Sequence, residues 1–529
     1  MLCCTWLVAS VTFFLSAPGW LLVPIRREDH DNDRKQVEGL KSKKKSATFL
    51  LNLLLFYTRM LWQGAVYISE GKGLWSIVAV IRRRTAVALA SFTKYELKQE
   101  EAVVSRVAFG SCANQSAPQP IWTAISAFDP QVFIWLGDNI YADAKLPVRF
   151  IGRKRTSGPF KNTPRFWPVS AEEMQKKYMM AKSISGYSAL RKTTQIIGTW
   201  DDHDYGMNDA GKELSSKDVS QQLMLDFLDE PKDSPRRKQK GVYASYTYGP
   251  IGKRIKVILL DTRYHRDAIF SNGAMLGETQ WAWLERELKK GDAQLNIIAS
   301  SIQVISNMSA VVRPFFHVES WSNFPAEQER LYKLIADYNV SGVIFISGDV
   351  HFCEITRFEC APVEYPLFDL TSSGLTQAVE ELTNPVIASV LRFAAWFVPN
   401  TMRVYNSHCR YKSCVYGKRN FGTLEIDWDA DPVMIAMSVR DIFGSRVSSV
   451  EVPLSMLQPG ALKREPLKRG EVRRHCTLDA DLPWTRKYLL AYSFFGLCLV
   501  MTASPCLISY MAFNKLRVRR RRGQNQKAD

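Results

Sequence analysis

The sequence predicts an α/β fold, because short apolar strands alternate with amphipathic helices from about residue 103 to 450. The clearest unit is a strand at 103–109, a helix at 121–128 and a second strand at 132–136. The helix has apolar residues at helical spacing, whereas both strands are continuous apolar runs. In such a unit the strands are parallel, so their carboxyl ends meet at one edge of the sheet.

Further strands and helices extend this alternation toward the C-terminus. The predicted strands are 194–200, 255–260, 296–301 and 340–346, each rich in β-branched residues. A helix is predicted at 276–290, where apolar residues share one face and basic residues precede Gly291. Another helix, at 325–338, leads into the last of these strands, and such alternation implies sheets covered by helices. Segments 149–168 and 231–240, rich in basic residues and proline, are predicted loops.

The composition indicates a large folded chain and argues against a nucleic-acid partner. Of the 529 residues 46% are hydrophobic, enough for an extensive core. The net charge of +18 lies in clusters that flank apolar segments or fall in predicted loops, without interleaved aromatic residues. We therefore expect no nucleic acid as a partner. Five cysteines would pair in an oxidising compartment in an order that the sequence does not give: Cys353, Cys360, Cys409, Cys414 and Cys476.

Both ends of the chain predict membrane segments. Residues 488–513 are uncharged and mostly apolar, long enough for a transmembrane helix across a bilayer of about 30 Å, and a basic tail follows at 514–529. The N-terminal region 1–85 is predicted to be a signal anchor or membrane-associated region with two apolar runs. The run at 2–25 suits a signal peptide or signal anchor. The run at 47–68 contains an arginine, which leaves both a span and an interfacial position open.

These segments define a domain order and a topology. Residues 103–450 form the predicted globular domain, and 451–487 form a polar linker to the membrane helix. Basic residues favour the cytosolic side, so the C-terminal tail and the basic loop at 26–45 are expected there. The globular domain is then lumenal or extracellular. The arginine run at 82–84 argues the other way.

Potential metal ligands follow the ends of the predicted strands. They are Cys112, Asp138, Tyr141, Asp202, His203, Asn208, Asp349 and His351. Each alone has an ordinary structural explanation, such as a turn or a helix N-cap, but their shared position after strands favours metal binding. Thiolate and phenolate ligands favour a strongly Lewis-acidic or redox-capable ion such as ferric iron, whereas carboxylate, amide and imidazole groups suit a neighbouring divalent ion.

Two adjacent metal ions point to one class of reaction. Metals roughly 3.5 to 4 Å apart hold both an attacking hydroxide and the substrate oxygens of an in-line displacement. Phosphate esters need such help because their negative charge repels a nucleophile. The ligand set therefore predicts hydrolysis of a phosphate ester.

Eight sequence blocks carry a resemblance to a known family. In order they are FGSC, GDNIYAD, WDDHDYGMND, LLDTRYHRD, LGETQWAWLERELKKGDAQLNIIASSIQ, WSNFPAEQERLY, SGDVH and FDLTSSGLT. This series resembles the signature blocks of the PhoD-like alkaline phosphatases, a branch of the calcineurin-like metallophosphoesterases. The resemblance covers roughly residues 105–450. It implies a two-sheet αββα sandwich with a multinuclear site that holds iron and calcium, or other divalent ions.

The resemblance also implies a division of the metal ligands. Asp138 resembles the carboxylate shared between metals. Cys112, Tyr141 and Asp349 resemble the family's ligands on the iron side. Asp202, Asn208 and His351 resemble ligands or near-ligands of the second metal region.

Four further positions are read from the same resemblance. His203, with Asp202 beside it, is expected to be catalytic and would contact the phosphoryl group or protonate the leaving oxygen. Arg263 or Arg266 would bind phosphate oxygens, although a structural ion-pair partner is an equal alternative for an arginine after a strand. Asp204 stands where relatives usually have glutamate.

We therefore expect a membrane-anchored, metal-dependent phosphatase that hydrolyses phosphate monoesters or diesters through a metal-bound hydroxide, with no covalent phosphoenzyme. Two alternatives stay open. One is a phosphodiesterase or phospholipase that acts on lipid head groups, which membrane tethering would favour. The other is a catalytically weak membrane scaffold that retains the fold for interaction.

Overall fold

The computed structural model describes residues 101–145, 166–269, 273–306, 311–312, 318–397, 400–464 and 473–525. The predicted N-terminal region 1–85, with its two apolar runs, lies outside these residues. Most of the predicted loop at 149–168 does as well.

The first of two six-stranded sheets has the order β14-β13-β12-β1-β2-β5. Its strands are β1 (Arg106–Gly110), β2 (Val132–Leu136), β5 (Gln195–Thr199), β12 (Asn420–Asp427), β13 (Met434–Asp441) and β14 (Arg446–Pro453). β1, β2 and β5 are parallel, and the antiparallel strands β12, β13 and β14 extend the sheet from β1. The parallel strands are buried on both faces, as their continuous apolar runs predicted.

The second sheet has the order β10-β11-β9-β8-β7-β6. Its strands are β6 (Ala244–Tyr248), β7 (Ile255–Leu259), β8 (Leu295–Ala299), β9 (Val343–Ser347), β10 (Cys353–Phe358) and β11 (Leu367–Ser372). The four central strands are parallel, with antiparallel β6 and β10 at the two edges. A separate ribbon pairs β3 (Asp143–Lys145) with β4 (Phe166–Pro168).

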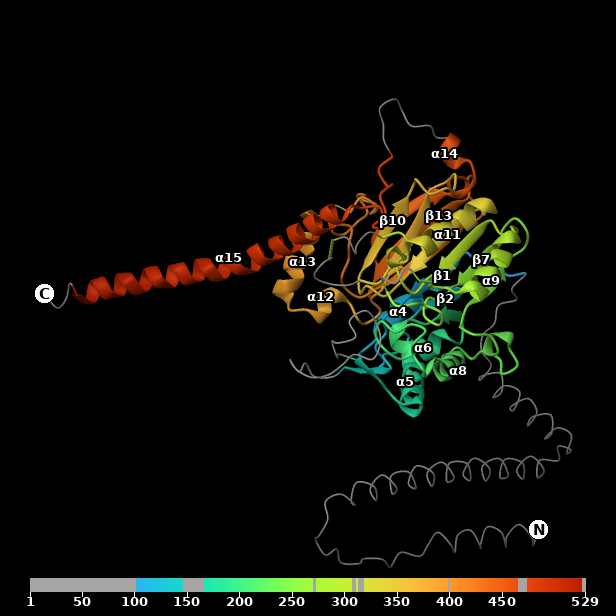
Figure 1. Cartoon of the computed structure of the whole chain (residues 1–529), viewed down its shortest axis with the longest axis horizontal. Helices are drawn as coiled ribbons and strands as arrows, with labels where there is room; N and C mark the ends of the chain where they lie inside the picture. The colour runs from blue at the N-terminus through green and yellow to red at the C-terminus, as the bar shows by residue number, and fades with distance from the viewer. Residues whose placement is uncertain are drawn as a thin grey trace, which may run out of the picture. The chain divides into compact units, whose positions relative to one another are not determined.

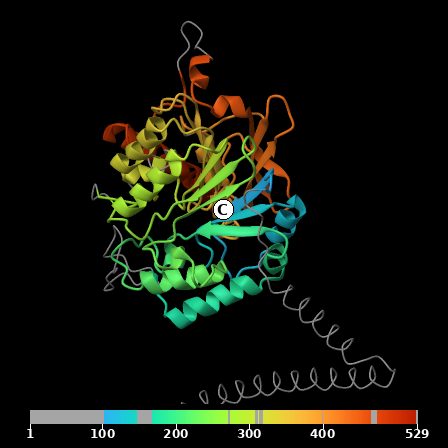
Figure 2. The same cartoon turned by 90° about the vertical axis from the view of Figure 1, so that its right-hand side faces the viewer.

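Helices cover the outer faces of the two sheets (Figure 1). The helices that the structure describes are α4 (Ile121–Phe128), α5 (Ala171–Ser183), α6 (Ser185–Leu190), α7 (Asp202–Tyr205), α8 (Lys217–Phe227), α9 (Glu278–Lys289), α11 (Pro325–Asp337), α12 (Val379–Leu382), α13 (Pro385–Phe397), α14 (Ala461–Arg464) and α15 (Trp484–Asn525), with short 3-10 turns η1 (Pro235–Arg237), η2 (Trp321–Asn323) and η3 (Leu454–Leu457). Most of α15 covers no sheet and extends away from the domain (Figure 1). Figure 2 shows α9 and α11 on one side of the sheets and α4 on the other.

Side-chain alternation along the strands explains this layering. In β2, Ile134 joins the core between the sheets, whereas Trp135 packs outward, with its ring centroid 5.4 Å from that of Trp122 in α4. In β9, Phe345 faces Tyr332 of α11, with ring centroids 6.4 Å apart, so Ile344 points between the sheets. Successive side chains of a strand point to opposite faces, so each central strand contributes to two layers.

The structure confirms the predicted α/β fold with two sheets and covering helices. β2 and α4 coincide with the predicted ranges 132–136 and 121–128, and the other predicted elements differ by a few residues at their ends. Several strands were not predicted from the sequence, among them β13 and β14. Their polar and apolar residues are mixed, which is a weaker signal than the apolar run of a strand buried on both faces.

The segment 451–487 packs against the domain, which differs from the expected polar linker. It begins within β14, and Leu457 in η3 is fully buried. A disulfide joins Cys476 to Cys360, and the buried carboxylate of Asp479 accepts a hydrogen bond of 2.9 Å from Ser322 Oγ. The described parts of this segment are therefore attached to the domain up to the start of α15.

The C-terminal helix α15 is a candidate membrane span. It begins before the predicted start at residue 488 and continues through the basic residues to Asn525. Its segment Trp484–Val518 is long enough and apolar enough to cross a membrane. Only 6% of the most apolar window is buried, which distinguishes α15 from the core helix of a soluble domain.

We expect Ile344→Ala to lower the free energy of unfolding by about 2 to 5 kcal/mol, because it leaves a cavity between the sheets. Urea unfolding of the purified chain measures the change. Ile251→Ala is the control, because the Ile251 side chain is 83% exposed, and it should change stability by less than about 0.5 kcal/mol. Equal effects of the two substitutions would contradict the two-sheet core.

Candidate metal centre

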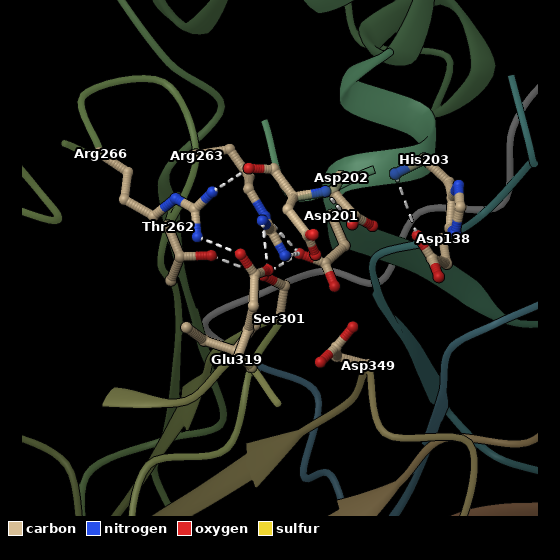
Figure 3. A network of polar contacts seen from close by, with 12 residues as sticks. Asp138, Asp201, Asp202, His203, Thr262, Arg263, Arg266, Ser301, Glu319 and Asp349 are labelled. Carbon is tan, nitrogen blue, oxygen red and sulfur yellow. Dashed lines mark hydrogen bonds and ion pairs between the residues drawn. The ribbon is translucent and has the colours of Figure 1, made fainter. Parts of the chain in front are cut away.

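The candidate site lies where the carboxyl ends of parallel strands from both sheets meet. The segments after β1, β2 and β5 come from the first sheet, and the segment after β9 comes from the second. A bridge between Ser111 and Ser373 joins the end of β1 to the end of β11, so the two sheets come together at this edge. Figure 3 shows acidic side chains from these segments pointing toward one another.

Four of the predicted ligands have a left-handed backbone. Their φ angles are 62° at Cys112, 50° at Asp138, 72° at Asp349 and 61° at His351. Positive φ is uncommon for residues other than glycine, and its concentration at one edge is typical of a functional site. Each sharp turn ends a strand and redirects the chain across the sheet edge.

Gly137 permits the closest contact between two of these turns. Its φ is 99°, and a Cβ at this position would lie 2.4 Å from Asp201 Cβ. The turn after β2 and the turn after β5 therefore touch through backbone that only glycine can supply without displacement.

A thiol, a carboxylate and an imidazole form the first group of potential ligands. Cys112, Asp138 and His351 each offer a ligand atom within 4.8 Å of the other two. Cys112 Sγ lies 3.4 Å from Asp138 Oδ2, and Tyr141 Oη lies 3.2 Å from His351 Nε2. His351, which the resemblance assigned to the second metal region, is thus brought together with the thiol and the phenol.

Carboxylates dominate the remaining groups. Potential ligand atoms within 4.8 Å of one another belong to Asp138, Asp202 and His203, to Asp201, Asp202 and Asp349, and to Asp202, Asp209 and Glu319. Asp138 and Asp202 each occur in more than one group, so they connect the two ends of the site. The sequence analysis did not propose Asp201, Asp209 or Glu319 as ligands. Asp201 and Asp209 flank the predicted ligands in one acidic run, whereas Glu319 lies outside every named strand of the described residues.

Asp143 orients His203. The His203 Nδ1 atom lies 2.7 Å from Asp143 Oδ1, and Asp143 Oδ2 accepts a 3.0 Å hydrogen bond from the backbone N–H of Asn208. Burial alone would lower the pKa of His203, but the carboxylates of Asp202, Asp138 and Asp143 raise this pKa well above its usual range. These carboxylates therefore favour the protonated form of the imidazole. Asn208, a predicted ligand, is brought beside it.

Asp204 fixes the backbone of the turn that carries Asp138. Its buried carboxylate accepts hydrogen bonds from the backbone N–H of Asp138 at 3.1 Å, Asn139 at 3.2 Å and Asp201 at 2.6 Å. The last bond belongs to a capping box that begins α7. The acid that replaces the usual glutamate is therefore a positioning residue in this chain.

Arg263 and Arg266 lie behind the acidic cluster and are almost fully buried (Figure 3). Arg263 Nε donates a 2.6 Å hydrogen bond to Asp201 Oδ1, and Arg263 Nη1 lies 2.5 Å from Glu319 Oε2. Arg266 pairs with the same glutamate and donates a 2.6 Å bond to the backbone carbonyl of Asp209. These contacts correspond to the structural alternative that the sequence left open.

The charge balance of the cluster fits metal ions. Among the described residues, Asp201 Oδ2 and Asp202 Oδ1 are buried without a hydrogen-bond partner. Burial, and after it the charge of neighbouring acids, raises the pKa of Asp349 and of the Cys112 thiol well above their usual ranges. Buried charged groups need a partner of opposite charge. A cation held between these side chains would satisfy the free oxygens and favour the ionised forms.

The neutral imidazole of His351 suits the same interpretation. Burial, and after it the nearby positive charge of His203, lowers the pKa of His351 to about 4. The ring is therefore uncharged near neutral pH, which is the state in which histidine binds metals.

Comparisons with known proteins show which sequences this chain is similar to. A family model described as PhoD-like phosphatase matches residues 107–433. The curated alkaline phosphatase D of Bacillus subtilis (strain 168) is 23% identical over 209 residues, 35% of this chain and 35% of the relative. The aligned part thus spans about a third of that relative's length.

Two solved structures are similar over most of the chain. A protein described as PhoD has a TM-score of 0.49 and 14% identity, covering 77% of this chain and 79% of its own. GAP50, described as the anchor in the inner membrane complex of Plasmodium, has a TM-score of 0.39 and 10% identity. The match covers 74% of this chain and 95% of GAP50.

We expect Gly137→Ala to lower the metal content and the stability of the chain more than Gly252→Ala does. Both glycines have positive φ, but a Cβ at Gly252 meets nothing within 4 Å. The control therefore reports backbone strain alone, and the contact with Asp201 should add about 1 to 3 kcal/mol of destabilisation. Elemental analysis and urea unfolding measure both effects. Indistinguishable variants would contradict the close contact between the two turns.

Proposed function

The chain belongs to the PhoD-like phosphatase family, and from that premise we propose that it hydrolyses phosphate esters in a metal-dependent reaction. The observation that carries the proposal is the set of thiol, phenol, imidazole and carboxylate groups at the strand ends, all of them buried or partly buried. The described residues place more carboxylates in this cluster than Arg263, Arg266 and His203 can neutralise. A phosphate ester, being anionic, would approach it only when cations are bound.

We propose two or more metal ions, iron together with calcium or another divalent ion. Cys112, Asp138, Tyr141 and His351 would hold one of them, and Asp138 would reach the second. The second would be held by Asp202, Asn208 and Asp349. When bound, the ions would supply positive charge that offsets the phosphoryl oxygens and would lower the pKa of a water molecule.

His203 is proposed to donate a proton to the leaving oxygen of the ester. The carboxylates of Asp202 and Asp138 raise the pKa of its imidazole and so favour the protonated form, and Asp143 fixes its Nδ1. The proton on the other ring nitrogen, Nε2, is then the one available to the substrate. General acid catalysis of this kind typically contributes about 10² to 10⁴ in rate.

Arg263 is proposed to position Asp201 and Glu319, with no direct contact to phosphate. Its buried ion pairs support this role, and Arg266 holds Glu319 from the other side. The substrate contact first expected for these arginines is thus the less favoured of the two alternatives.

Membrane anchoring through α15 is the second part of the proposal. The domain at 103–450 would be lumenal or extracellular, and the basic tail at 514–529 cytosolic. The disulfides Cys360–Cys476 and Cys409–Cys414 support this sidedness, because disulfides persist in oxidising compartments.

Asp138→Asn should lower phosphate-ester hydrolysis by at least about 100-fold, because it removes the ligand common to two groups of the site. Rates on an aryl phosphate monoester and an aryl phosphate diester measure the effect and reveal which ester is preferred. Asp129→Asn is the control, since Asp129 has a similar φ of 54° but an exposed side chain.

Equal rates for Asp138→Asn and the wild-type chain would refute the site. If the metal-loaded wild-type chain hydrolyses neither ester, the scaffold alternative is favoured.

In sealed microsomes, protease added from outside should remove the tail at 514–529 and leave the domain intact, because the bilayer shields the lumen. Immunoblots with antibodies to the tail and to the domain measure this. Detergent is the control and should expose the domain. Cleavage of the domain in intact vesicles would contradict the proposed sidedness.

A further inference from the structure

Helix α13 exposes more apolar surface than a soluble domain normally does. Its only buried residues are Ala388, Val390 and Ala394. The large apolar side chains that it leaves partly or mostly exposed are Val386, Ile387, Phe393, Trp396 and Phe397. Contiguous apolar surface of this kind marks a protein or membrane interaction site.

The exposed helix packs against the candidate membrane span. Ala394 of α13 and Phe494 of α15 belong to one cluster, together with partly buried side chains up to Cys498. Figure 1 shows α12 and α13 beside the part of α15 nearest the domain. The two helices therefore share one apolar surface.

The length of the apolar part of α15 determines where its contact with α13 lies relative to a bilayer. Beyond Cys498, the apolar residues before Lys515 extend only about 24 Å at 1.5 Å per residue. The hydrocarbon core of a bilayer is about 30 Å thick. A bilayer spanned by α15 must therefore reach the level of the contact with α13.

A basic and aromatic groove adjoins α13. It has a volume of about 340 Å³ and is lined in part by Arg392, Phe393, Trp396, Arg410, Tyr411 and Lys412. The disulfide Cys409–Cys414 closes the loop that forms its far wall.

The charges of the groove suit an anion. Arg392 pairs with Glu380, and Arg410 Nη1 lies 2.7 Å from Asp441 Oδ2. Lys412 Nζ lies 5.1 Å from the centre of the Trp396 ring, and no carboxylate of the described residues pairs with it. In the described part of the chain, the two arginines and Lys412 thus have only two carboxylates, Glu380 and Asp441, as partners. Each guanidinium group has further N–H donors of the kind that bind phosphate.

We propose that α13 lies in the membrane interface, with its apolar side chains among the acyl chains and the phosphate of an anionic phospholipid in the groove. Aromatic and basic residues are the usual anchors at this depth of a bilayer. The proposal rests on the anchoring by α15 proposed above. It adds a second attachment that would hold the domain against the bilayer surface.

Insertion of α13 is tested with the full chain in vesicles of phosphatidylcholine that include brominated phosphatidylcholine. Trp396→Phe should lower the fraction of tryptophan fluorescence that the bromine atoms quench. Trp283→Phe is the control, because Trp283 lies in α9 on the other side of the domain (Figure 1). An unchanged quenched fraction in Trp396→Phe would overturn the proposal.

Headgroup binding is tested by energy transfer from tryptophan to dansyl-labelled phosphatidylserine or phosphatidylcholine in the same vesicles. The wild-type chain should prefer the anionic lipid, and Lys412→Glu should lower the preference about fivefold. Lys289→Glu, at an exposed position in α9, should leave it unchanged. Equal preference in the wild-type chain and Lys412→Glu would overturn the lipid site.

Carbonate extraction separates this proposal from the one on which it rests. If the wild-type chain leaves the membrane at high pH, anchoring by α15 fails, and the interfacial position of α13 fails with it. If the chain stays in the membrane and Trp396 is not quenched, the anchor holds and only the α13 proposal fails.

Discussion

The candidate site depends on an excess of carboxylates over positive charges at the place where the two sheets meet, which needs a bound cation to balance it. Asp138 and Asp202 connect the groups of potential ligands, and Asp349 reaches them from the second sheet. Neither sheet has the complete set, so the site exists only when both are packed. A cation bound there would therefore stabilise the packing of the sheets as well as the reaction geometry.

The surroundings of the cluster keep these charges in place. Asp204 holds the backbone of the turn after β2, Gly137 lets that turn touch the turn after β5, and Arg263 binds the rear of Asp201. These three residues are buried, and each makes a contact that helps to orient a candidate metal ligand toward the site. Precision at such a site comes from supporting residues of this kind.

Much of the fold and site followed from the sequence because the parallel strands are buried on both faces. Their apolar runs end sharply, so candidate ligands such as Cys112 and Asp349 could be selected by their position after a strand. The role of Arg263 could not be predicted from the sequence, because an arginine that follows a strand suits a buried ion pair and a phosphate-binding site equally well. The contact of His203 with Asp143 joins two sequence blocks that lie 60 residues apart, so no local pattern predicts it.

The central claim is that this chain holds metal ions between its two sheets. Elemental analysis of the purified full chain, combined with thermal unfolding before and after removal of metals by a chelator, tests it most directly. We expect at least two metal ions per chain and a lower Tm once they are removed. A chain that purifies without metal, and whose Tm the chelator does not change, would contradict it.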